Sequence, residues 1–351
     1  MFNKPNSGAG TIMVKSPVFA SAPCKLILSG EHYAVWGSQS LSVPIELRNS
    51  ATVSLSESAG FIVRRDWGEA DLSLPVDEVD PRALFLKGTY DALCGIAKKP
   101  ISGIEADIPI TSNPKGIGNS SSVAAAMAAA TLRLLGMPLS PGSLFACAHA
   151  ADLVAHGGSA SGVDARTVTI GSPIVFRKSF EPEKFSFKRA SVNMPADSAL
   201  VLVDTFTTEK CTTKEQIEKF AESFGMEKKP FECSPEERAA VIEDFEPVLK
   251  FLLAEFSRPK PSPSALGSLL LENHALLSRH AVSTPEIDSF ISECVGAGHA
   301  WGGKLTGAGG KGGSLVILAK KAGARGVSAI AESLGFQAFP VSISRQGILV
   351  K

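Results

Sequence analysis

Short runs of alternating apolar and polar residues, rich in β-branched side chains, fill the chain between Thr11 and Asp71. Such alternation is typical of β-strands, and Gly, Ser and Asn separate the runs. We therefore expect strands in TIMVKSPVFASAP, CKLILSG, LSVPIEL, ATVSLSES and FIVRRD. Further strands are expected at 101–109, in ARTVTIG, PIVFRK and ALVLVDT after Asp164, on both sides of the glycine loop in KLTGAGGKGGSLVIL, and at 338–343.

Other segments carry residues that favour helices and end in residues that stop them. Residues 81–97 are expected to form a helix with Asp80 as its N-cap and Pro81 at its first position. The run VAAAMAAATLRLLG consists of strong helix formers and is closed by Gly136. Further helices are expected at 141–155, over most of 212–296 and at 322–334, whereas residues 1–10 are expected to be loosely held.

Composition narrows the class of protein. A chain of 351 residues suggests about two domains, and 44% apolar with 20% charged residues is near the average for a globular protein. Lys plus Arg and Asp plus Glu both number 35, so the balanced charge gives no electrostatic footprint for a nucleic-acid partner. The change from strand-rich to helix-rich sequence near 190–210 suggests a mixed α+β protein in two lobes.

Cysteine usage and apolar runs bear on the compartment. The six cysteines are scattered and form no C-x-x-C pair, which fits reduced thiols better than a disulfide framework. We recognise no secretory signal and no membrane-spanning stretch, so we expect a cytoplasmic protein without a membrane partner. A peroxisome-like organelle stays open as an alternative, although the last three residues are not the Ser-Lys-Leu address.

The segment SNPKGIGNSSS at 112–122 leads directly into the alanine-rich helix. Gly116 and Gly118 would let the backbone approach a phosphate, and the amides and hydroxyls of a helix start favour anions. The dinucleotide pattern fails because Ser121 takes the place of its third glycine, and the Walker pattern fails as well. The alternative to phosphate binding is that these residues only cap a helix, but one cap needs one such residue.

Several charged residues are candidates for chemistry. Asp164 ends the loop SASGVD at an expected loop-to-strand junction. Its side chain there either points into a cleft or only caps a turn. Asp152 lies among small apolar residues of a helix, so it is either exposed or recruited to a site. His149, Asp152 and His156 share one helix face, which leaves a zinc site, and hence a metal hydrolase, as a weaker alternative.

Near the N-terminus, the segment PCKLILSGEHYAVWG places Lys25 at the start of an apolar strand and Glu31-His32 after its end. A lysine at a strand end is usually only solvated. A Gly-Glu-His sequence after a buried strand is rarer and points towards a site.

Three separated motifs together resemble those of the GHMP small-molecule kinases. They are APCKLILSGEHYAVWG (22–37), PKGIGNSSSVAA (114–125) and KLTGAGGKGGS (304–314), and HGGSASGVDARTVTIG (156–171) is similar to the stretch that holds the family's catalytic aspartate. GEH followed by AVWG is most similar to the mevalonate kinase branch. The resemblance implies an N-terminal lobe at 1–195 with a mixed sheet like that of a ribosomal-protein domain. It also implies a ferredoxin-like α/β lobe at 196–351, with the active site in the cleft between the lobes.

The resemblance also implies roles for individual residues. Asp164 would be the general base, and Lys25 would stabilise the alkoxide and the transferring charge. Ser120 and Asp152 would be Mg²⁺ ligands. The ATP phosphates would be cradled by Pro114, Lys115, Gly116, Ile117, Gly118, Asn119, Ser120 and Ser121. The substrate pocket would be lined by Lys25, Glu31, His32 and Asp164. The third motif would support residues 114–121, which we call the phosphate loop.

Several positions depart from the family pattern, among them Val76, which stands where an Asn near the adenine is often found, and the loop before Asp164, which is one residue longer. Asn119 stands where the first of two serines is usual, and with three serines following, Ser121 could face Mg²⁺ in place of Ser120. Asp152 is one methylene shorter than the usual Glu. Cys24 replaces the usual Gly before Lys25, Ile117 stands for Leu or Met, and Lys311 interrupts a run of Gly.

The activity implied by the resemblance is ATP- and Mg²⁺-dependent phosphorylation of the C5 hydroxyl of (R)-mevalonate, in the isoprenoid pathway. A homodimer is compatible with it. The first alternative is another GHMP kinase, acting on phosphomevalonate, homoserine or a sugar. The second is a catalytically silent protein of the same fold that senses a metabolite.

Overall fold

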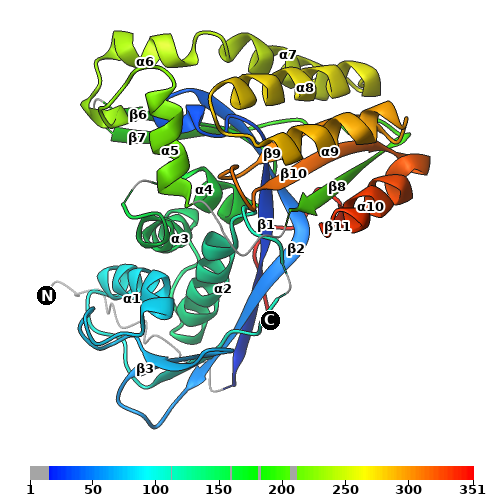
Figure 1. Ribbon diagram of the computed structural model, residues 1–351. Coiled ribbons are helices and arrows are strands. Elements are labelled where there is room, and N and C mark those ends of the chain that lie inside the picture. The colour runs from blue at the N-terminus through cyan, green and yellow to red at the C-terminus, as the bar shows by residue number, and fades with distance from the viewer. Residues whose placement is uncertain (1–15, 112, 159, 181–182, 206–211) are drawn as a thin grey trace, which may run out of the picture.

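The computed structural model describes residues 16–111, 113–158, 160–180, 183–205 and 212–351 (Figure 1). The strands of the first lobe form one mixed sheet in the order β12-β1-β2-β5-β3-β4, with β6 paired to β2 and β7 paired to β6. All pairs are antiparallel except β3 with β5. The strands are β1 (Val18–Ser29), β2 (Gln39–Leu55), β3 (Phe61–Arg65), β4 (Gly68–Asp71), β5 (Ile104–Asp107), β6 (Ile174–Phe180), β7 (Glu183–Arg189) and β12 (Leu349–Val350).

The two longest strands, β1 and β2, run side by side through the molecule (Figure 1). The expected strand pairs at 11–30 and at 41–58 are therefore each one continuous strand within the described residues. The apparent break at Pro23-Cys24 is a register shift between β1 and β2, where Pro23 faces Arg48 and Cys24 faces Ile45, so the additional residues lie on β2. A bulge of this kind keeps a strand continuous while it re-aims the side chains that follow.

Helix α2 (Asn119–Leu134) is the centre of the first lobe, and every residue from Ser121 to Leu132 is buried. A helix that is apolar all round belongs in a core, and its alanines let neighbours approach closely. Those neighbours are β1, β2 and the helices α1 (Leu84–Ala97), α3 (Pro141–Ala155) and α4 (Val163–Ile170). The expected helices at 81–97 and 141–155 are confirmed, and Asp80 caps the short 3-10 turn Pro81–Ala83 that precedes α1.

The strand expected in ARTVTIG is wrong, because these residues form α4. Their β-branched side chains favour strands, but local bonds make them compatible with a helix. Thr167 donates its hydroxyl proton to the Val163 carbonyl at 2.7 Å, and Thr169 donates to Ala165 at 2.7 Å. Asp164 therefore lies in the first turn of a helix rather than at the start of a strand.

The second lobe contains an antiparallel sheet in the order β11-β8-β10-β9. In chain order this is 4-1-3-2, with helices crossing after the first and third strands, so the expected ferredoxin-like arrangement is confirmed. Its strands are β8 (Ser198–Asp204), β9 (Ala300–Thr306), β10 (Ser314–Lys320) and β11 (Gln337–Val341). Its helices are α5 (Thr213–Glu222), α6 (Pro235–Ile242), α7 (Glu246–Ser257), α8 (Pro263–Arg279), α9 (Pro285–Gly296) and α10 (Ala324–Ser333).

The lobes meet where β1 passes β9. Thr306 donates its hydroxyl proton to the Ile27 carbonyl at 3.2 Å, and its oxygen accepts the Ile27 N–H at 3.3 Å. The small strand β12 returns to the edge of β1, which the sequence did not predict. Division of the chain near residue 196 stays a prediction, and the loosely held segment expected at 1–10 lies outside the described residues. In the described part of the chain, no helix combines the length and apolarity needed to cross a bilayer.

Replacing Gly171, which ends α4, should destabilise the fold that presents Asp164. Gly171 has φ +62°, and a Cβ there would overlap the backbone of Gly347. Gly225 has a similar φ of +70° but nothing near its missing Cβ. We expect Gly225→Ala to lower the melting temperature by about 2–4 °C, since its only cost is the strain of a left-handed backbone conformation. Gly171→Ala should lower it by about twice that or more in thermal unfolding, and equal losses would contradict the contact.

Candidate active site

A cavity of about 670 Å³ lies where β1, α2, α4 and the loop between β9 and β10 meet. Its size is that of a small-molecule site. Most of the residues that the sequence singles out line it: Lys25, Glu31, His32, Lys115, Gly116, Gly118, Asn119, Ser120, Asp152 and Asp164. Pro114, Ile117 and Ser121 do not line it but lie in the same loop and first helical turn.

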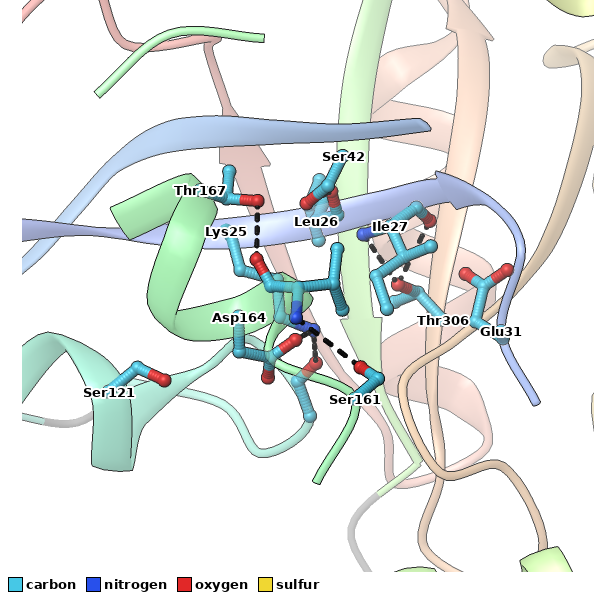
Figure 2. Close-up of polar contacts among 12 residues, drawn as sticks. Lys25, Leu26, Ile27, Glu31, Ser42, Ser121, Ser161, Asp164, Thr167 and Thr306 are labelled. Atoms are coloured by element: carbon cyan, nitrogen blue, oxygen red, sulfur yellow. Dashed lines mark hydrogen bonds and ion pairs between the residues drawn. The ribbon is translucent and has the colours of Figure 1, made fainter. Parts of the chain in front are cut away.

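Lys25 and Asp164 form an ion pair in this cavity, with 3.0 Å between Nζ and Oδ1. Figure 2 shows Lys25 reaching from β1 towards Asp164 in the first turn of α4. The lysine side chain is 2% exposed and the carboxylate 21% exposed, so solvent still reaches the acid. Lys25 Nζ also donates to the Gly116 carbonyl at 3.3 Å. The candidate base Asp164, the ammonium group of Lys25 and the loop that contains Gly116 are thus in direct contact.

The phosphate loop leads into α2 through Gly118, whose φ is +73°. A Cβ at this position would lie 3.1 Å from Lys25 Cγ and 3.4 Å from Asp164 Oδ2, so only glycine fits without displacing the pair. No side chain caps the first turn of α2. The unpaired N–H groups of that turn, together with the positive end of the helix dipole, favour an anion there. The helix-cap alternative is not supported by this geometry.

Asp152 is recruited to the site, because its side chain is 1% exposed and accepts two hydroxyl protons from the start of α2. Ser120 donates to Oδ1 at 2.8 Å and Ser121 donates to Oδ2. Burial raises the pKa of the Asp152 carboxyl from 3.8 to about 7, and the nearby Asp164 carboxylate adds to the rise. A cation beside Asp152 would offset both effects, since it favours the charged form.

The donor set around Asp152 fits Mg²⁺. This ion prefers hard oxygen ligands and is commonly held by one or two carboxylates together with substrate phosphates. Asp152 supplies a carboxylate with a raised pKa, and Ser120 supplies a hydroxyl that lines the cavity. Ser121 is fully buried, so Ser120 is the better placed of the two serines.

A second buried ion pair lies beside the Lys25–Asp164 pair. Lys304 on β9 donates to Glu31 Oε1 at 2.5 Å, and both side chains are 0% exposed. Burial raises the pKa of the Glu31 carboxyl, while the Lys304 ammonium opposes the rise. Glu31 Oε2 has no hydrogen-bond partner among the described residues, although Glu31 lines the cavity. Figure 2 shows Glu31 and Ser121 on opposite sides of the Lys25–Asp164 pair.

His32 offers a second acceptor at this end of the cavity. Its Nε2 bonds to the Ala308 carbonyl at 2.9 Å, and burial lowers the pKa of the ring to about 4. A neutral ring must carry its proton on Nε2 to donate to a carbonyl, which leaves Nδ1 as an acceptor. Nδ1 is buried and has no hydrogen-bond partner in the part of the chain that the structure describes. Two orphaned acceptors therefore await a donor, such as a hydroxyl.

The zinc alternative finds no support. Asp152 bonds to serines, and the ring of His149 stacks on Phe145 with centroids 5.3 Å apart. Among the described residues there is no group of three or more side chains arranged to hold a metal ion.

Comparison with known families agrees with this geometry. Residues 84–172 match the family described as GHMP kinases N terminal domain, and residues 252–334 match GHMP kinases C terminal. The chain belongs to the GHMP kinase family.

Similar proteins of this family include both mevalonate kinases and other kinases. The chain is 28% identical to the mevalonate kinase of Thermococcus sibiricus, over 95% of this chain and 98% of the relative. The structure of L. major mevalonate kinase in complex with R-mevalonate superposes with a TM-score of 0.74 at 20% identity, covering 96% of this chain and all of that one. Lactococcus lactis galactokinase complexed with galactose gives 0.74 at 18% identity, covering 95% of each chain. The fold alone therefore does not select the acceptor.

Lys304 is a site residue of this GHMP kinase that sequence reasoning missed. Lys304 and Thr306 are two residues apart on β9, so both side chains point to the same face of the sheet. That face is turned towards β1. A lysine within the glycine-rich strand of the third motif is the signal that could have revealed it. The third motif contacts the loop at 114–118, since Ser314 donates to the Lys115 carbonyl at 2.7 Å.

The raised pKa of Asp152 predicts that charge at this position destabilises the ligand-free GHMP kinase. The native state binds this proton up to about pH 7, whereas an unfolded Asp releases it near 3.8. Stability from this group is therefore present at low pH and is lost as pH rises through about 7. In Asp152→Asn the loss is absent. Its melting temperature relative to wild type should rise between pH 5 and pH 8 by about 2–5 °C in EDTA.

The exposed Asp107 offers the matched control, since Asp107→Asn should show no such pH-dependent gain. An Asp152→Asn protein whose melting temperature relative to wild type is the same at pH 5 and pH 8 would contradict the raised pKa.

Proposed function

We propose that this GHMP kinase transfers the γ-phosphoryl group of ATP to the C5 hydroxyl of (R)-mevalonate. The observation that carries the proposal is the Lys25–Asp164 pair, 3.0 Å apart, in one cavity between a phosphate-binding helix start and the acceptor groups of Glu31 and His32. A cavity with an anion site at one end and hydroxyl-binding groups at the other suits phosphoryl transfer to a small alcohol.

In the proposed reaction, Asp164 accepts the proton of the acceptor hydroxyl while the oxygen of that hydroxyl bonds to the γ-phosphorus. The bond from that phosphorus to the β-phosphate oxygen breaks, and ADP leaves with the electron pair. Lys25 stabilises the developing alkoxide and the charge on the transferring group, because its ammonium is held between Asp164 and the Gly116 carbonyl. Closure of the lobes around the substrates would exclude water.

The nucleotide is proposed to bind with its phosphates along 114–121, where backbone amides and the helix dipole favour anions. Ser120 and Asp152 would hold Mg²⁺. When bound, this ion would neutralise charge on the phosphates and orient them. Asp152 keeps the loop in shape through Ser120 and Ser121.

The acceptor is proposed from two supports. The first is that relatives over nearly the full chain are mevalonate kinases. The second is chemical, since Glu31 Oε2 and His32 Nδ1 are orphaned acceptors that would bind a hydroxyl and repel a phosphate. This disfavours an acceptor that presents a phosphoryl group at that end of the cavity.

A cytoplasmic location belongs to the proposal. Cys24, Cys94, Cys147, Cys233 and Cys294 are all free, which fits a reducing compartment.

Asp164→Asn should strongly reduce turnover while ATP still binds. The amide oxygen can still accept from Lys25, so the lysine keeps a partner, but the base is gone. We expect kcat to fall by about 10²–10⁴-fold, with the dissociation constant for ATP within about threefold of wild type in calorimetry. The exposed Asp91 serves as a control, because Asp91→Asn should leave both values unchanged. An Asp164→Asn enzyme with near-normal kcat would falsify the base assignment.

An acceptor panel tests the substrate. Mevalonate, phosphomevalonate, homoserine and galactose are each assayed for ADP release, with Mg²⁺ or with EDTA, and with Asp164→Asn as the blank. We expect Mg²⁺-dependent release with mevalonate and about tenfold less, or none, with the others. Activity on another alcohol without activity on mevalonate overturns the acceptor. ATP binding without ADP formation on any acceptor favours a metabolite sensor.

A further inference from the structure

Behind the phosphate loop, three asparagine amides converge on the thiol of Cys24. We call Cys24, Asn49, Asn113 and Asn119 the amide cluster. Asn49 Nδ2 donates to Cys24 Sγ at 3.3 Å and to Asn119 Oδ1 at 3.2 Å. Asn113 Nδ2 donates to Asn49 Oδ1 at 3.3 Å and lies 3.6 Å from Cys24 Sγ. Cys24 Sγ in turn donates to Asn119 Oδ1 at 3.5 Å.

The cluster is built into the sheet rather than into the cavity wall. Asn49 is 2% exposed and Cys24 is 0% exposed, and neither lines the cavity. Asn49 lies on β2 opposite Ala22, next to the register shift between Pro23 and Cys24. Burial raises the pKa of the Cys24 thiol to about 12, so the thiol keeps its proton and acts as a donor to Asn119.

Asn119 links the amide cluster to the phosphate loop. Its Nδ2 donates to the Pro114 carbonyl at 2.7 Å, which ties the first helical residue to the beginning of the loop. Its Oδ1 is held by Asn49 and Cys24, so the amide can take only one of its two orientations. Thr111, just before the loop, is fixed by the same Asn49, to whose Oδ1 it donates at 2.5 Å.

A loop with two glycines at positive φ and no side-chain cap is costly to hold in one conformation. Contacts that fix it before the ligand arrives lower the ordering cost of binding. The amide cluster supplies such contacts from the side facing away from the ligand. It also joins two departures from the family pattern, because Cys24 and Asn119 touch each other.

We propose that Asn49, together with Cys24, is a positioning residue for the phosphates of the nucleotide. It acts through Asn119, which holds the loop 114–119 in its anion-binding shape. The inference rests on the proposed function in so far as the loop binds a nucleoside triphosphate. It does not depend on which alcohol accepts the phosphoryl group.

The test is equilibrium binding of ATP and of adenosine, measured by calorimetry without any acceptor. Asn49→Leu removes both donors while keeping a side chain of similar size. We expect its dissociation constant for ATP to rise about tenfold or more, which corresponds to about 1.4 kcal/mol. Adenosine, which has no phosphate, should bind as it does to wild type. Thr131→Val is the control, since this buried hydroxyl bonds only within α2, and it should change neither constant.

A pair of variants at Cys24 guards against a folding defect in Asn49→Leu. Cys24→Ser keeps a donor and an acceptor, whereas Cys24→Ala differs from it by one oxygen atom. We expect Cys24→Ala to weaken ATP binding about threefold or more relative to Cys24→Ser, with adenosine unaffected. This selective effect on the phosphate-bearing ligand is one that a merely structural role would not produce.

The outcomes separate the inference from the proposed function. If wild type binds ATP and both Asn49→Leu and Cys24→Ala keep its ratio of ATP to adenosine affinity, the inference is overturned alone. Equal weakening of ATP and adenosine has the same consequence, because it indicates general damage. A wild-type chain that binds no ATP overturns the proposed function and the inference together.

Discussion

The ion pair between Lys25 and Asp164 sets the geometry of the site. An ammonium group that is almost fully buried needs an opposite charge and further acceptors, since a lone charge in such surroundings is strongly destabilising. Asp164 supplies the charge and the Gly116 carbonyl supplies the acceptor, which brings α4 and the phosphate loop to the same strand. The glycine at 118 follows from this, because any side chain there would crowd the pair.

The parts of the site that could be predicted are those carried by local sequence. The run of small polar residues before an alanine-rich helix predicts an anion site, and Asp164 follows a Gly/Ser loop as expected of a presented side chain. Contacts between distant segments could not be predicted. Lys304 and Glu31 are 273 residues apart, and nothing in either segment specifies the partner. The roles of the individual residues stay predictions until they are tested.

The errors in secondary structure have the same origin. Residues 163–170 have strand-like propensities, but α4 forms because its threonine hydroxyls bond back along the helix and its buried face packs on α2 and α3. Tertiary packing overrides local preference here. In the sequence, Pro23-Cys24 looks like a break between two strands, yet in the sheet it is a register shift within continuous β1–β2 pairing.

Two of the residues named as departures from the family pattern lie in contact. Cys24 touches Asn119, and the shortened acid Asp152 receives a hydroxyl from Ser121 in addition to that of Ser120. Each exchange keeps the number of hydrogen bonds around the loop high while it changes which atoms make them. Such compensation is expected in a tightly packed polar interior, where an orphaned group costs more than an altered one.

Helix α2 has a consequence for how this lineage can drift in sequence. Its residues from Ser121 to Leu132 are all covered, so volume rather than polarity limits what evolution can place there. Bulky replacements would wedge the sheet away from the helices and misalign the loop that begins the same helix. The alanine-rich sequence of α2 therefore reflects a steric constraint, because the helix must stay close to its neighbours to hold the loop at its N-terminus in place.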